Sequence, residues 1–227
     1  MKHISTETSQ KATEILIRNE TPADYRRVEE IARSAFYNLY VPGCSEHYLA
    51  HILRGHEDFL PELDLVVELG GQVIGNIMYT KATLVDETGQ KKPILTFGPV
   101  SILPEYQRQG YGKRLLEASF ERALGLGYDL IVIFGVPGNY VGRGFKSCQK
   151  YNVCLENGVF PCAMLVKELK PGVLDGRKWV YYDSPALQFD EQQAQRFDQG
   201  FEPLEKKYQP SQEEFYILLH SRVQPQE

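Results

Sequence analysis

The stretch LPEYQRQGYGKRLL, Leu103 to Leu116, decides how the rest of this sequence is interpreted. It starts at the end of an extended apolar run and finishes in residues with helical spacing. Between them, Gly110 and Gly112 stand one residue apart in the segment QRQGYG. Such a turn favours an anion, because the first amides of a helix lack intrahelical partners and glycine lets a ligand approach the backbone. The alternative is a plain helix entry with solvated basic residues.

Two well-known nucleotide-binding motifs do not fit this stretch. A Walker A loop needs GxxxxGK followed by Ser or Thr, but Gln107 replaces its first glycine and Arg114 follows the lysine. A dinucleotide fingerprint GxGxxG beginning at Gly110 needs a third glycine where Leu115 stands. The unit of strand, glycine turn and helix therefore needs another explanation.

The composition is that of an ordinary soluble, folded protein. The chain has 227 residues, of which 42% are hydrophobic and 24% charged, so a core can form without disulfides or metals. The formal net charge of −5 argues against nucleic acid as a main partner.

Targeting signals are not expected from this sequence. The segment MKHISTETSQKATEILI has no continuous apolar region of the kind found in secretory signals. No run approaches the roughly 20 apolar residues of a membrane span. The four cysteines form no CxxC pair, which favours reduced thiols and a cytoplasmic location.

Hydrophobic periodicity and turn residues predict a mixed succession of strands and helices. Strands are expected at 15–18, on either side of Gly70–Gly71 within 64–85, and at 93–103, 129–136, 151–156 and 162–169. Helices are expected from Pro22 to Phe36 with Thr21 as N-cap, from about 45 to 53 as an entrance element, at 113–124, and as a short turn within 138–145.

The strand at 93–103 contains an interruption. Gly98 and Pro99 lie in its middle, where proline removes a hydrogen-bond donor and glycine weakens the strand. The pair predicts a bulge or the close approach of a ligand.

Two motifs in this order resemble those of a known family. QRQGYG resembles the Q/R-x-x-G-x-G/A motif of the GNAT (GCN5-related) acyl-CoA N-acyltransferases, and YVGRGF, Tyr140 to Phe145, resembles their Y-x-x-x-G-F segment. The resemblance covers roughly residues 15–169 and extends to a subgroup of uncharacterised predicted acetyltransferases. It implies an α/β fold with a mixed, mostly antiparallel sheet flanked by helices, followed by a C-terminal extension.

The resemblance also implies a donor site for acetyl-CoA. Backbone amides of the loop would hold the pyrophosphate, the strand before it would pair with the pantetheine arm, and the Val100 amide would polarise the thioester carbonyl. The implied binding residues are Val100, Ser101, Ile102, Gln107, Arg108, Gln109, Gly110, Tyr111, Gly112 and Lys113.

Tyr140 is implied as the general acid that protonates the departing thiolate. The alternative is a tyrosine that packs beside the last strands. Gly142 stands where the family usually has a bulkier residue, so the helical turn there departs from the pattern. No carboxylate occurs in PILTFGPVSI, and Glu105 is expected to be solvated, so a base lies elsewhere, is a water chain, or is unnecessary.

The implied function is transfer of acetyl from acetyl-CoA to a primary amine through a tetrahedral intermediate. The alternative is a noncatalytic CoA-binding or regulatory module of the same fold. Expected partners are acetyl-CoA or CoA and an unidentified amine, with no metal, nucleic acid or membrane, and a homodimer is compatible with the aromatic tail.

The expected organisation has three parts: a polar leader at 1–13, an acetyltransferase domain at 14–170, and an aromatic and helical extension at 171–227 packed on the core. Trp179, Tyr181 and Tyr182 predict a hydrophobic clasp, with a dimer contact or an acceptor-pocket wall as alternatives.

Histidines and cysteines elsewhere invite other interpretations. His47 and His51 have the i, i+4 spacing of metal ligands, but the glutamate of HExxH is missing, so aromatic packing is favoured over a metal. They could also contact the acceptor with Tyr37, Tyr40 and Tyr48. Cys148 is expected to be a buried structural thiol and not an acyl carrier.

Overall fold

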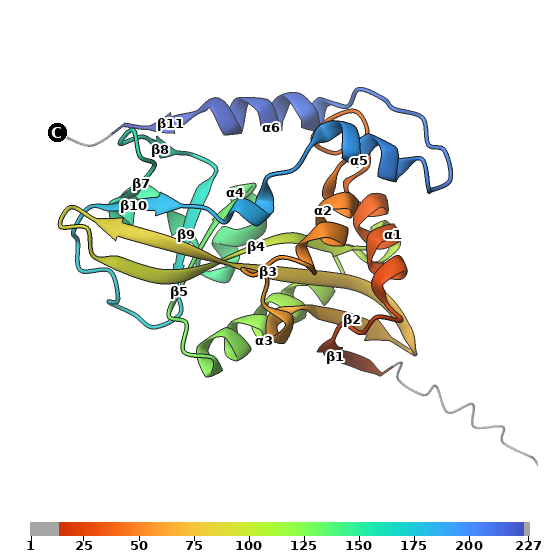
Figure 1. Cartoon of the computed structure of the whole chain (residues 1–227), viewed down its shortest axis with the longest axis horizontal. Coiled ribbons are helices and arrows are strands. Elements are labelled where there is room, and N and C mark those ends of the chain that lie inside the picture. Colours follow the sequence, from red (N-terminus) through yellow and green to blue (C-terminus); the bar gives the residue numbers. More distant parts are fainter. Residues whose placement is uncertain (1–13, 225–227) are drawn as a thin grey trace, which may run out of the picture.

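A computed structural model describes residues 14–224, in which one mixed sheet of nine strands forms the centre (Figure 1). Its main path is β1-β2-β3-β4-β5-β9-β6, and along this path only β4 and β5 are parallel. These strands span Ile15–Asn19 (β1), Leu65–Leu69 (β2), Gln72–Asp86 (β3), Lys91–Ile102 (β4), Leu130–Phe134 (β5), Lys146–Ser147 (β6) and Met164–Glu168 (β9). The expected fold class is confirmed.

Helices cover both faces of the central strands (Figure 1). Successive residues of β3 point to opposite faces: the Tyr79 hydroxyl lies 2.8 Å from Ser119 Oγ of α3, whereas Met78 packs with Ala50 and Leu53 of α2. These helices are α1 (Tyr25–Phe36) and α2 (Glu46–Leu53) on one face and α3 (Tyr111–Gly125) on the other. None of the helices in the described part of the chain combines the length and the apolar character that a membrane crossing requires.

Short elements complete the chain. Two further helices, α5 (Glu191–Asp198) and α6 (Pro210–His220), belong to the C-terminal extension. The remaining strands are β7 (Val153–Cys154), β8 (Phe160–Pro161), β10 (Trp179–Tyr182) and β11 (Arg222–Val223). The remaining helical turns are α4 (Pro137–Tyr140), η1 (Pro61–Leu63), η2 (Pro104–Tyr106), η3 (Val141–Arg143), η4 (Cys148–Tyr151) and η5 (Pro185–Leu187).

The first helix begins later than the sequence predicts. α1 starts at Tyr25 with Asp24 as its N-cap, so the expectation of Thr21 as N-cap is wrong. The carboxylate of Asp24 accepts hydrogen bonds from Thr21 N–H at 2.9 Å and from Thr21 Oγ1 at 2.7 Å, and it pairs with Arg18 at 2.7 Å. These contacts close a turn over Thr21 to Asp24, and the helix can begin only after it.

The hairpin and the interruption in β4 are as expected. Gly70 and Gly71, with φ of 58° and 87°, join β2 to β3, as a tight antiparallel turn requires. Opposite Gly98 and Pro99, the β3–β4 register shifts between Ile77 and Tyr79. The strand expected at 151–156 is wrong in length, because the helical turn η4 takes its first residue and only β7 remains extended.

The C-terminal extension adds to the sheet, which the sequence did not reveal. β10 pairs antiparallel with β3, with Trp179 opposite Asp86, and parallel with β7. Farther on, α6 runs across the molecule and leads to β11, which pairs with β8 (Figure 1). The expected boundary at residues 170 and 171 therefore falls between two strands of one sheet. The expected leader, residues 1–13, lies outside the described residues.

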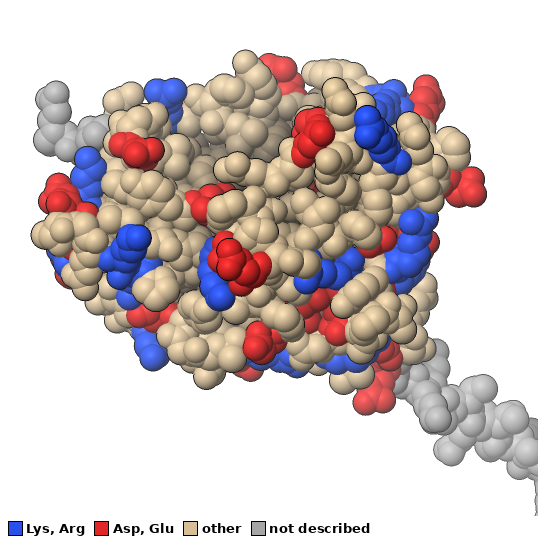
Figure 2. Space-filling view, viewed as in Figure 1, with Lys and Arg blue, Asp and Glu red and all other residues tan. Residues whose placement is uncertain are grey.

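Charges are interspersed on the surface. Figure 2 shows blue and red side chains mixed over the viewed face, with no continuous basic area on that face.

A buried polar cluster attaches the extension to α1 and α2. Arg33 of α1 donates from Nε to Asp198 Oδ1 at 2.6 Å and from Nη1 to Glu202 O at 2.9 Å. Nε2 of His47, a fully buried side chain of α2, lies 3.1 Å from the same Asp198 oxygen. Its ring packs edge-on against Phe201 at 5.0 Å between centroids.

His47 makes this junction sensitive to acid. Burial, with a smaller effect of Arg33, lowers the pKa of His47 to about 4, although Asp198 and Glu29 act in the opposite direction. In the unfolded chain a histidine has a pKa of about 6.5. As the pH falls below that value, the unfolded state takes up a proton that the folded state excludes, so stability is lost.

We predict that the melting temperature falls between pH 7 and pH 5 and that His47→Gln reduces the fall, because the variant has no proton to exclude at this position. The contribution of one group is at most about 1.4 kcal/mol per pH unit. Thermal melts at both pH values measure it, with His220→Gln on exposed α6 as control. An unchanged pH dependence in His47→Gln would contradict the assignment.

Candidate active site

The sheet opens where β4 separates from β5. The two strands pair at a single position, Leu95 opposite Ile131. Beyond it, β4 continues to Ile102 paired with β3, while β5 ends at Phe134 paired with β9. One edge of β4 is therefore unpaired along its last residues.

Hydrogen-bond alternation decides which amides of β4 face this opening. Leu103 N–H donates to Ile74 O across the β3–β4 pair. Because bonded and non-bonded pairs alternate in an antiparallel ladder, Ser101 directs its backbone toward β3. Val100 and Ile102 direct their N–H and C=O groups to the open side.

Two side chains fix the end of β4. Gln107 donates from Nε2 to Ile102 O at 2.9 Å, which satisfies the carbonyl that points away from β3. The hydroxyl of Ser101, a buried side chain, donates to Asn76 Oδ1 of β3. The N–H groups of Val100 and Ile102 remain on the open side, and Val100 is the one of the two residues that lines the cavity there.

The loop that follows presents backbone amides. Arg108 and Gly110 have left-handed φ values of 61° and 92°, and Gln109 folds back to donate to Glu105 O at 2.8 Å. Within residues 14–224, no backbone carbonyl accepts from the amides of residues 108–113, since the first such bond of α3 is Arg114 N–H to Gly110 O. Where the backbone alternates between right-handed and left-handed φ values, successive unpaired N–H groups line a concave surface. At a helix N-terminus such a surface suits an anion.

The two glycines have different roles. Gly110 needs its left-handed φ, which side chains rarely adopt. At Gly112 a Cβ would meet only Ile102 Cγ1 at 3.6 Å, so the protein itself does not demand glycine there. The space that Gly112 leaves open is available to a ligand. Nearby, Lys113 pairs with Glu117 at 3.7 Å and Tyr111 packs against the core.

A cavity of about 350 Å³ occupies the opening, and we call it the β4–β5 cavity. Its walls come from β4, from the end of β5, from α4, from the α1–α2 segment and from the C-terminal extension. The lining residues are Phe36, Tyr40, Val41, Ser45, Glu46, Leu49, Phe97, Gly98, Pro99, Val100, Phe134, Gly135, Tyr140, Phe189, Glu191 and Phe215. Val100 and Tyr140 are thus brought to one cavity.

Tyr140 is held by aromatic contacts. Its ring centroid lies 5.8 Å from that of Phe97 and 5.6 Å from that of Phe145. A Cβ at Gly135 would lie 2.6 Å from the Tyr140 ring, so glycine there makes room for it. Burial, with a smaller effect of Tyr40, raises the pKa of Tyr140 well above its ordinary value. The phenol is therefore neutral and can donate a proton at pH 7.

Of the side chains considered for the acceptor, only one reaches this cavity. Tyr40 lines it, whereas Tyr37 donates to Leu204 O and Tyr48 to Gln193 Oε1, both at 2.8 Å. His47 and His51 pack against Phe197, in agreement with the expected aromatic packing. The described residues contain no cluster of three potential metal ligands.

The carboxylates and the tail residues of the cavity were not predicted from the sequence. Glu46 is the first residue of the helix that was expected as an entrance element. Its position in the sequence beside two histidines and a tyrosine was the signal that could have identified it as a cavity residue. Glu191, Phe189 and Phe215 belong to the extension, and no local pattern marks them.

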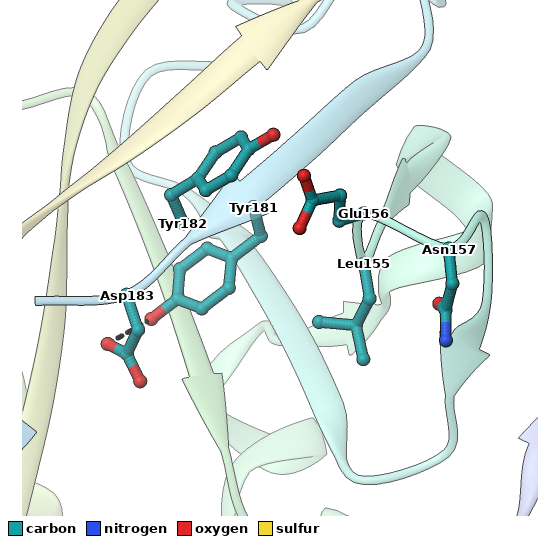
Figure 3. Close-up of a pocket in the computed structure, with 6 residues that line it drawn as sticks. All are labelled: Leu155, Glu156, Asn157, Tyr181, Tyr182 and Asp183. Atoms are coloured by element: carbon teal, nitrogen blue, oxygen red, sulfur yellow. Dashed lines mark hydrogen bonds between the residues drawn. The ribbon is translucent and has the colours of Figure 1, made fainter. Parts of the chain in front are cut away.

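A second pocket, of about 450 Å³, lies away from these residues. Figure 3 shows β10, which carries Tyr181 and Tyr182, beside the turn at Leu155, Glu156 and Asn157, with the Tyr181 ring directed toward Asp183. The Tyr181 hydroxyl donates to Asp183 Oδ1 at 2.8 Å. None of the residues expected to bind acetyl-CoA or to catalyse its reaction lines this pocket, although Tyr181 and Tyr182, considered above as an acceptor-pocket wall, do.

Trp179 and Cys148 are structural. Trp179, from the expected clasp, is the first residue of β10 and is buried in the core. Cys148 is also fully buried, and burial raises the pKa of its thiol to about 12, as expected for a structural cysteine.

Similarity to solved structures extends over most of the chain. The Escherichia coli GNAT family N-acetyltransferase YhbS, solved in complex with CoA, is 25% identical and superposes with a TM-score of 0.65, covering 79% of this chain and 95% of its own. A Brucella melitensis GNAT acetyltransferase in complex with acetyl-CoA is 24% identical, with a TM-score of 0.60 and coverage of 78% and 99%. The second shows the fold alone.

Sequence comparison points the same way. The uncharacterized N-acetyltransferase YjhQ of Escherichia coli (strain K12) is 30% identical over 93 residues, 40% of this chain. The match spans 50% of the length of that relative. A family model described as "Acetyltransferase (GNAT) family" matches residues 25–145, more than half of the chain. This protein belongs to the GNAT acetyltransferase family.

Proposed function

We propose that this protein is an acyl-CoA-dependent N-acyltransferase that moves acetyl from acetyl-CoA to a primary amine. The observation that carries the proposal is the opening between β4 and β5, where the free Val100 amide and the neutral Tyr140 phenol line one cavity. YhbS, which is 25% identical, was solved in complex with CoA, which supports a donor that carries CoA.

The donor is proposed to bind along β4 and the loop after it. The amides of Arg108 to Lys113 and the open space at Gly112 suit the two phosphates of the donor. The pantetheine arm is proposed to lie beside the end of β4, a stretch of backbone supported by Ile102, Ser101 and Gln107. Ser101 and Gln107 support it through the strand, since their side chains bond to Asn76 and Ile102.

Val100 and Tyr140 would have different roles in the reaction. As the amine nitrogen bonds to the thioester carbon, the carbonyl oxygen gains negative charge and accepts a hydrogen bond from Val100 N–H. As the C–S bond breaks, the sulfur leaves with the electron pair and takes the Tyr140 proton. The tyrosinate regains a proton from the nitrogen, which removes the cost of ionising a phenol of raised pKa.

The domain organisation and the cellular location of the protein are also part of the proposal. Residues 14–170 are proposed as the catalytic domain, and the extension from 171 as the part that completes its acceptor side. All four cysteines are free, which supports the cytoplasm as its location.

The first prediction concerns donor binding. Acetyl-CoA at about 100 times its Kd stabilises by about 2.7 kcal/mol, so the melting temperature is expected to rise by about 5–10 °C, and ATP is expected to have no effect. Gly110→Val is expected to abolish the shift, because its φ of 92° strains a β-branched residue. Gly125→Ala in α3 is the matched control. A wild-type protein that acetyl-CoA does not stabilise would disprove the proposal.

The second prediction concerns the acid. Tyr140→Phe is expected to lower kcat by about 10²- to 10⁴-fold, because the thiolate loses its proton donor, while the acetyl-CoA shift persists. Release of free thiol measures turnover, and the exposed Tyr182→Phe is the control. Full turnover in Tyr140→Phe would remove this role.

The third prediction concerns the position of the acid. In Gly135→Ala the new methyl group would lie 2.6 Å from the Tyr140 ring, so the ring must move. We expect kcat to fall by about 10- to 100-fold. Gly138→Ala has nothing within 4 Å and is expected to keep its activity. Equal activities of the two variants would show that the ring position is unimportant.

A further inference from the structure

The acceptor side of the β4–β5 cavity combines aromatic rings with carboxylates. Tyr40 and Phe215 stack at 4.0 Å between centroids, and Phe189 and Phe36 extend this apolar wall. The ionisable side chains that line the cavity besides its tyrosines are carboxylates, those of Glu46 and Glu191. No Lys, Arg or His of the described chain lines it.

The two carboxylates are held close by one residue. Ser45 N–H donates to Glu46 Oε2 at 3.0 Å, and Ser45 Oγ donates to Glu191 Oε2 at 3.4 Å. Within residues 14–224 neither carboxylate has a Lys, Arg or His nitrogen within 4.0 Å, although 15 ion pairs form elsewhere. The described chain therefore places no cationic side chain against these two carboxylates.

Burial makes that charge costly. Burial, and the nearby charge of Glu191, raise the pKa of Glu46. Withdrawing a carboxylate from water without a counterion raises its free energy, and a cation in the cavity lowers it again. Glu191 is exposed and stands at the start of α5, so it adds negative charge at the cavity mouth.

We propose that the acceptor enters as a primary ammonium ion on a compact aromatic body that carries no carboxylate, and that Glu46 binds this ammonium and takes its first proton. The inference rests on the proposed acetyl transfer and names its substrate class. Aromatic walls favour an aromatic body by stacking, and they tolerate a nearby cation. A carboxylate on the acceptor would be repelled by Glu46 and Glu191.

The proton steps balance with this assignment. The ammonium gives one proton to the Glu46 carboxylate, which releases it to solvent after the reaction. The neutral nitrogen then forms the C–N bond, and its second proton returns to Tyr140 as the thiolate takes the proton of the phenol. The products are a neutral amide, the free thiol of CoA and one proton.

The test compares 2-phenylethylamine with L-phenylalanine, which has the same aromatic body and an added carboxylate. The wild-type protein is expected to acetylate 2-phenylethylamine with a kcat/KM at least about tenfold higher. In Glu46→Gln we expect a loss of about tenfold or more with 2-phenylethylamine, a smaller difference between the two amines, and an unchanged KM for acetyl-CoA. In the wild type, protonation of Glu46 is expected to lower kcat/KM at acidic pH, and in Glu46→Gln this acidic limb of the pH profile is expected to disappear.

Two further variants calibrate the result. Glu191→Gln is expected to lower kcat/KM for 2-phenylethylamine by about two- to threefold, because it is exposed. Glu121→Gln, on the exposed face of α3 and outside the cavity, is expected to match the wild type.

Each failure has a separate meaning. Without stabilisation by acetyl-CoA the proposed function fails. If acetyl-CoA stabilises the protein but 2-phenylethylamine is not acetylated, or L-phenylalanine is used equally well, the substrate class is wrong. A Glu46→Gln variant that keeps the wild-type preference and pH profile would remove Glu46 from the site.

Discussion

The divergence of β4 from β5 is the constraint on which the rest of the site depends. Parallel pairing at one position, Leu95 with Ile131, holds the strands together at one end and leaves the far edge of β4 unpaired. A backbone amide without a partner inside a protein needs a ligand, water or a side chain. Gln107 supplies a side-chain donor for the Ile102 carbonyl, whereas the Val100 N–H, at the wall of the cavity, is left for a ligand.

The two ends of the cavity are built in different ways. The donor end uses backbone groups, and their positions follow from strand register and from the glycine turn at Gly110. The acceptor end uses side chains of α2, of the segment before it, and of the C-terminal extension. The proposed donor end therefore depends on the backbone of the fold, whereas the proposed acceptor end depends on individual side chains.

The sequence predicts the donor end far better than the acceptor end. QRQGYG and YVGRGF are local patterns, and the left-handed φ of Gly110 gives one of their glycines a physical reason, so the fold and the loop could be anticipated. Glu46 and Glu191 are 145 residues apart, and only the packing of α5 beside α2 brings both to Ser45. The same applies to Trp179 and Asp86, whose pairing makes the extension part of the sheet. The start of α1 was missed because the bond from Arg18 to Asp24 crosses from a strand to a turn.

The attachment of the extension through Arg33 and Asp198 also bears on the order in which the two ends of the site form during translation. Translation proceeds from the N-terminus, so β4, the glycine turn and Tyr140 leave the ribosome before Phe189, Glu191 and Phe215 do. A nascent chain can therefore complete its donor surface while the acceptor wall is still missing. Until Asp198 reaches Arg33, a thioester bound there would face water, and selectivity for an amine would be the last property the newly made protein acquires.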